Sequence, residues 1–131
     1  MDRVVEHAIH LALLAESTLH ALHVVDTSVV PLDSHSGSTY DYMETARRAS
    51  VVAIRDRAVD AGIHTIEAVR RGTPYREILD YAAENDVDLV VIGTHGRTGL
   101  QRTLLGSTAE RVVRLSDVPV LTVRTTPVAR A

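Results

Sequence analysis

Two short glycine segments, Gly93–Gly96 and Gly106–Ser107, have the residue types and the spacing of a phosphate-binding loop. They read GTHG and, nine residues later, Gly-Ser. Glycine has no Cβ atom, so the backbone at Gly93 and Gly96 can turn tightly and approach a phosphate. Gly106 and Ser107 stand at the expected start of a helix, where free amide groups and the helix dipole favour an anion. Further hydrogen bonds and charge can come from Ser107, Thr108, Arg97 and Arg102.

The alternative interpretation is a strand-to-helix turn that binds nothing, in which Ser107 only caps the helix. Glycine-rich turns of this kind are weak signals by themselves. Gly93, Gly96 and Gly99 read GxxGxxG, which differs from the GxGxxG dinucleotide fingerprint, and the lysine of a P-loop is absent. The spacing alone therefore leaves both interpretations open.

The elements that must position this loop follow from the apolar periodicity. The pattern predicts helices at residues 2–16, 40–61, 74–83 and 107–115, and strands at residues 19–25, 64–69, 88–92 and 119–124. Thr73 and Pro74 have the types of an N-cap and a first helical residue, and Gly62 is placed to end the long helix. Such alternation predicts an α/β fold, an open parallel sheet with helices on both faces. The strand at 88–92 is the most continuous apolar run, so we expect it in the centre of the sheet.

Composition restricts the function further. The 131 residues, 45% of them hydrophobic, fit one domain over residues 1–131, and the net charge of −3 argues against a nucleic-acid partner. All 14 basic residues are arginine and cysteine is absent, which excludes Schiff-base lysines, thiolate metal sites and a cysteine nucleophile. No apolar run approaches the ~18 residues of a membrane span, and the first helix interrupts its apolar pattern with Glu6 and His7. A cytoplasmic location is the expectation.

The run from Val87 to Arg124, VDLVVIGTHGRTGLQRTLLGSTAERVVRLSDVPVLTVR, closely resembles the C-terminal half of universal stress protein domains. ATP-binding members of that family carry GxxG, nine residues, and then Gly followed by Ser or Thr, and every position of that pattern is filled. The resemblance continues upstream through the LHALHVVD and VVEHAIHLA segments, so it covers nearly the whole chain. It implies a Rossmann-like domain that binds ATP, with or without Mg²⁺. No residue has the character of a dedicated general base, so we expect a regulatory stress-response module with at most slow ATP hydrolysis and not an enzyme.

The resemblance also implies roles for individual residues. The ribose and phosphates would be held by Gly93, Gly96, Gly106, Ser107 and Thr108. His95 and Arg97 would lie beside the phosphates, and Val24 and Ile92 would flank the adenine. The strand Pro119–Arg124 resembles the edge through which these domains pair as homodimers. The alternative is a dimeric interaction module of the same fold that binds no nucleotide. A third possibility, a hydrolase or nucleotidyl-transferring enzyme, is not supported because the sequence shows no set of catalytic residues.

One feature departs from the family pattern. The family opens with a strand whose Asp contacts the nucleotide, and that strand lies between those matched here by residues 19–25 and 88–92. This chain begins in the helix that follows it. We expect that Met1 is a late start on a longer protein; the other possibilities are direct pairing of the two strands and a partner chain between them.

The remaining candidates are histidines and arginines. His7 and His10 share a helix face without the partners of a zinc site, and His20 and His23 point to opposite faces of a strand. Only His95 is expected to be functional. Arg70 and Arg71 are expected in an exposed turn.

Overall fold

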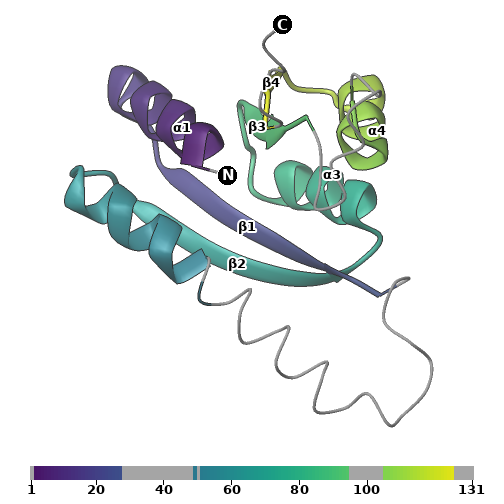
Figure 1. Ribbon diagram of the computed structural model, residues 1–131, viewed down its shortest axis with the longest axis horizontal. Helices are drawn as coiled ribbons and strands as arrows, with labels where there is room; N and C mark the ends of the chain where they lie inside the picture. Colours follow the sequence, from purple (N-terminus) through teal and green to yellow (C-terminus); the bar gives the residue numbers. More distant parts are fainter. Residues whose placement is uncertain (1, 28–48, 50, 95–104, 126–131) are drawn as a thin grey trace, which may run out of the picture.

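The computed structural model describes residues 2–27, 49, 51–94 and 105–125 and shows alternating helices and parallel strands (Figure 1). In chain order the elements are α1 (Asp2–Ala15), β1 (Leu19–Asp26), a helix whose described part includes residues 51–60, β2 (Thr65–Gly72), α3 (Pro74–Glu84), β3 (Val90–Gly93), α4 (Ser107–Leu115) and β4 (Val120–Val123). The α/β class with parallel strands is therefore confirmed.

The strands form two separate ladders rather than one continuous sheet. β1 pairs with β2 in parallel, from Leu19 opposite Thr65 to the ends of both strands. β3 pairs with β4 in parallel, with Val90 opposite Val120. Within the described residues neither β1 nor β3 has a second neighbour, so the expectation of a central strand at residues 88–92 is wrong, and so is direct pairing of the two strands. All four residues of β3 are partly buried.

Two pairs of helices pack on these strands. α1 and the helix at residues 51–60 share a small apolar cluster in which Ala58 is completely buried beside Ala12 and Ile63. α3 contacts α4, β1 and β2, whereas α1 contacts β1, β3 and β4. α1 therefore connects the two ladders (Figure 1).

Local signals account for the ends of the helices. α3 begins after Thr73 as N-cap with Pro74 in its first turn, as the sequence predicts. The helix at residues 51–60 is followed by Gly62, whose φ of +86° lies in the left-handed region that favours glycine. α4 has the predicted bounds. β2 extends to Gly72, so Arg70 and Arg71 lie in a strand and not in the predicted turn.

Candidate functional site

The carboxyl end of β3 and the start of α4 are held together by backbone hydrogen bonds. The Thr94 N–H donates to the Val123 carbonyl at 2.9 Å, and the Gly106 N–H donates to the Thr94 carbonyl at 2.5 Å. The ends of β3 and β4 and the N-cap residue of α4 thus meet at Thr94. Two of the sequence-predicted residues, Gly93 and Gly106, are brought to the same junction although they are far apart along the chain.

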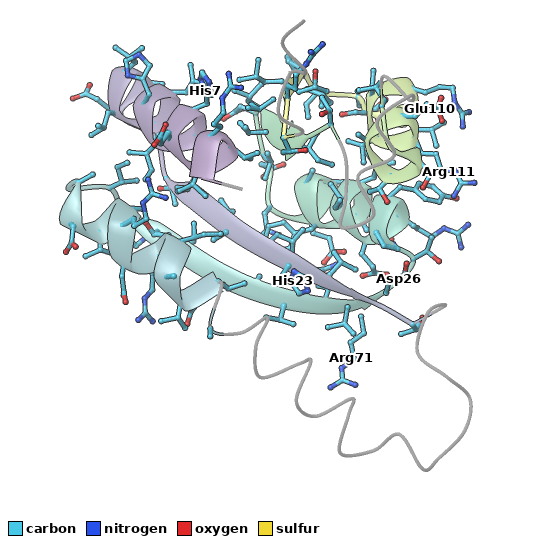
Figure 2. The ribbon with its side chains drawn as sticks, viewed as in Figure 1. His7, His23, Asp26, Arg71, Glu110 and Arg111 are labelled. Atoms are coloured by element: carbon cyan, nitrogen blue, oxygen red, sulfur yellow. The ribbon has the colours of Figure 1, made fainter. Side chains whose placement is uncertain are left out.

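The first turn of α4 combines exposed and buried residues. Gly106 is its N-cap, with φ −67° and ψ 166°, and among the described residues no side-chain hydrogen bond caps this end of the helix. Ser107 is exposed and Thr108 is partly buried. Glu110, the acidic residue of this turn, pairs with Arg114 at 2.9 Å, and Figure 2 shows Glu110 and Arg111 on the outer side of the helix. Such uncapped amides carry the positive end of the helix dipole, which attracts anions.

Gly93 is required by packing. A Cβ atom at this position would lie 2.5 Å from Cγ2 of Thr125 and 3.4 Å from Cγ2 of Val4. These two side chains fill the space beside the Gly93 Cα, so the glycine has a packing role here in addition to the ligand role that the sequence predicts. Val4 belongs to the start of α1, so the amino end of that helix also lies at the carboxyl end of β3.

The other predicted site residues divide into two groups. Val24 in β1 and Ile92 in β3 are both partly buried, and they belong to different ladders. His95, Gly96 and Arg97 lie outside the described residues. The structure therefore brings the predicted phosphate-binding positions Gly93, Gly106, Ser107 and Thr108 to one junction and leaves the two predicted adenine-flanking positions on separate strands.

Sequence reasoning did not identify Thr94 and Thr125 as parts of this junction. Thr94 is buried, and its Oγ1 accepts a hydrogen bond from the Thr125 N–H at 3.3 Å. Thr125 in turn covers Gly93. The only signal in the sequence was a hydroxyl residue between an apolar strand and a glycine loop, which does not reveal a partner 31 residues away.

A second polar cluster lies between β1, β2 and α3. The Tyr81 hydroxyl is 2.6 Å from His20 Nδ1, and the Arg70 guanidinium lies over the Tyr81 ring at 5.0 Å. Arg70 also binds Glu84 through two hydrogen bonds of 2.7 and 3.0 Å. Hydrogen bonding to Arg70 lowers the pKa of the Glu84 carboxyl, and burial raises the pKa of the Tyr81 hydroxyl. Arg70 is thus engaged within the protein rather than in an exposed turn.

Metal-ligand clusters and membrane-spanning helices are not found among the described residues. Within residues 2–27, 49, 51–94 and 105–125, no three His, Asp or Glu side chains gather as metal ligands, and His7 and His10 are exposed on α1. In the same part of the chain, no helix combines the length and the hydropathy that a bilayer span requires.

Comparison with known proteins gives consistent matches. The model of the universal stress protein family matches residues 1–124. The universal stress protein MJ0531 of Methanocaldococcus jannaschii is 32% identical over 122 residues, which are 91% of this chain and 72% of the relative. The structure of MJ0577, from the same organism, superimposes with a TM-score of 0.84 at 25% identity and covers 97% of this chain and 89% of its own. A universal stress protein solved in complex with cAMP gives a TM-score of 0.66 at 26% identity, covering 95% of this chain and 86% of its own.

Proposed function

This chain belongs to the universal stress protein family, and from that premise we propose that it binds ATP where β3 meets α4. It acts as a cytoplasmic regulatory module of the stress response that alternates between nucleotide-bound and nucleotide-free states. A solved family member in complex with cAMP supports an adenine nucleotide as the ligand. The complete GxxG, nine residues, Gly-Ser pattern supports a nucleotide with several phosphates.

The observation that carries this proposal is the hydrogen bond between Gly106 and Thr94. It sets the uncapped first turn of α4 beside the end of β3, which is the position where open parallel sheets bind ligands. The amides of Ser107 and Thr108 are then available to phosphate oxygens, and their hydroxyls can add hydrogen bonds.

The full proposed site includes residues on both sides of the junction. Gly93, Gly96, Gly106, Ser107 and Thr108 hold the ribose and phosphates, with Mg²⁺ as a companion ion of the phosphates. His95 and Arg97 lie beside them, and Val24 and Ile92 flank the adenine. The edge strand Pro119–Arg124 joins two copies as a homodimer, because an apolar unpaired edge is otherwise exposed.

The test is calorimetric titration of the chain with ATP, compared with the variants Ser107→Glu and Ser107→Gln. The glutamate places a negative charge where phosphate is proposed to bind, yet acidic residues suit the first turn of a helix, so folding is retained. Repulsion of about 1 kcal/mol or more weakens ATP binding at least about fivefold to tenfold, whereas the neutral glutamine binds nearly as the parent does. Equal affinities for all three proteins would place the phosphates elsewhere.

One observation favours a second candidate, a homodimeric interaction module that binds no nucleotide. Val24 and Ile92 lie on strands of different ladders, and within the described residues no strand joins these ladders at the adenine end of the site. If ATP releases no heat with the parent chain while sedimentation shows a dimer, this second function replaces the first.

A further inference from the structure

Arginine and tyrosine side chains gather where the start of α3 meets the middle of α4. The Arg111 guanidinium of α4 lies over the ring of Tyr75 in α3, with its Cζ 5.2 Å from the ring centroid. Arg76 lies 5.7 Å from the same centroid and donates a hydrogen bond to the Tyr75 hydroxyl at 3.2 Å. Arg114 follows Arg111 by three residues, so it lies on the same face of α4. These four residues form the arginine–tyrosine cluster.

Two of the three guanidinium groups in the cluster have no carboxylate partner within the described part of the chain. Arg114 is paired with Glu110 at 2.9 Å. Arg76 and Arg111 are both exposed, and neither forms an ion pair with a described carboxylate. Their contacts with Tyr75 involve only its ring and its hydroxyl, so most of the N–H donors of both groups remain available to a ligand.

The Tyr75 ring holds these cations in place. Tyr75 is partly buried and lies in the first turn of α3, directly after Pro74, whose ring restricts the backbone. α3 packs against α4, which fixes the tyrosine relative to Arg111. A free arginine side chain loses entropy when a ligand immobilises it, and a guanidinium already held on an aromatic ring loses less. The cluster is therefore preorganised for an anionic ligand.

The surroundings of the cluster favour a short acidic peptide over a nucleic acid. Glu77 and Asp80 of α3 place negative charge near Arg76, and Glu110 lies beside Arg114. The whole chain carries a net charge of −3. A nucleic acid has a charged phosphate at every nucleotide, so it would also meet these carboxylates. A peptide whose acidic residues are separated by neutral ones places its charge only at the arginines, which bind carboxylates through paired N–H donors.

We propose that the arginine–tyrosine cluster binds a short acidic peptide segment of a partner protein. Arg76 and Arg111 each hold one carboxylate of the segment, and the Tyr75 ring positions both guanidinium groups. Figure 2 shows Arg111 on the outer side of α4, where a partner can approach it. The binding uses neither Ser107 nor Thr108, so it is independent of the proposed nucleotide site and does not require ATP.

The test is an NMR titration of the full, isotope-labelled chain with a short peptide of alternating glutamate and glycine residues, acetylated and amidated at its ends. The peptide shifts the side-chain N–H resonances of Arg76 and Arg111. Arg76→Gln and Arg111→Gln each weaken binding at least about threefold, because each removes one charge-assisted pair. Arg55→Gln is the matched control, since it changes the net charge equally although Arg55 is already paired with Asp56 and Glu67.

A further variant separates a positioned site from general attraction between charges. Tyr75→Leu keeps all the arginines but removes the ring that holds them, so it weakens binding at least about twofold, and unchanged strand resonances verify its folding. Unchanged affinity of Tyr75→Leu, or equal losses for Arg55→Gln and Arg111→Gln, overturns the proposal. Shifts centred on the Ser107 and Thr108 amides overturn it as well. So does tighter binding of inorganic phosphate or of a short oligonucleotide at the cluster.

Discussion

The close contact at Gly93 makes a quantitative prediction about stability. In Gly93→Ala the new Cβ lies 2.5 Å from Thr125 Cγ2, whereas carbon atoms pack best at about 3.5–4.0 Å. Thr125 is β-branched and stiff, so it cannot rotate away cheaply. Overpacking of this kind costs about 1–3 kcal/mol, and the lower entropy of the unfolded alanine chain offsets about 0.4–1 kcal/mol of it. We expect a net loss of about 1–2 kcal/mol in the free energy of unfolding.

The assay is urea unfolding followed by circular dichroism for Gly93→Ala, Thr125→Ala and the double variant. Thr125→Ala removes Cγ2 and leaves its Cβ 3.7 Å from the new methyl group, an ordinary contact, so the double variant recovers about 1 kcal/mol relative to additivity. Gly62→Ala is the matched control. Its Cβ meets nothing within 4 Å, and its cost of about 1 kcal/mol comes from φ +86° alone. Adding Thr125→Ala to Gly62→Ala should not relieve that cost. If the losses in free energy of unfolding for Gly93→Ala and Thr125→Ala simply add in the double variant, the predicted contact between these residues is refuted.

Two further predictions concern the cluster around Tyr81. Tyr81→Phe removes the 2.6 Å hydrogen bond to His20 and lowers the free energy of unfolding by about 0.5–1.5 kcal/mol. The control is Tyr75→Phe, which has little effect because the Tyr75 hydroxyl contacts only the exposed Arg76 among the hydrogen bonds described. Equal losses of stability for the two variants in urea unfolding would contradict this prediction. Arg70→Gln raises the pKa of Glu84 toward its ordinary value, measured by NMR titration. The pKa of Glu84 is lower in the folded state than in the unfolded chain, so the ion pair with Arg70 stabilises the parent at pH values above the unfolded-state pKa. This stabilisation is lost as the pH falls through the folded-state pKa of Glu84, and the variant lacks this pH dependence. An unchanged Glu84 pKa would show that Arg70 is not its cause.

Local features of the fold could be predicted from the sequence. The bounds of α4, the N-cap at Thr73 and the helix stop at Gly62 follow from residue types within one or two turns of the chain. The positions of Gly93 and Gly106 at the two ends of a glycine loop also follow from sequence spacing. Their interpretation as a phosphate-binding site stays a prediction, since His95, Gly96 and Arg97 lie outside the described residues.

The pairing of β3 could not be predicted in this way. The apolar run of β3 indicated that the strand would be buried but not which strands would pair with it, because the same run suits a central strand and an edge strand. The partners of Arg70 could not be predicted from the sequence either, because Glu84 and Tyr81 contact Arg70 only when α3 packs on β2.

The sequence by itself determined the glycine loop, the alternation of helices and strands and the apolar character of each strand, all of which depend on neighbours along the chain. Only the tertiary structure decided that Thr94 joins Gly106, that Thr125 fills the space beside Gly93, and that β1 and β3 end up in separate ladders. The physical reason is that these contacts link segments far apart in sequence, and they form only when helices such as α1 pack across both ladders and set the distance between them.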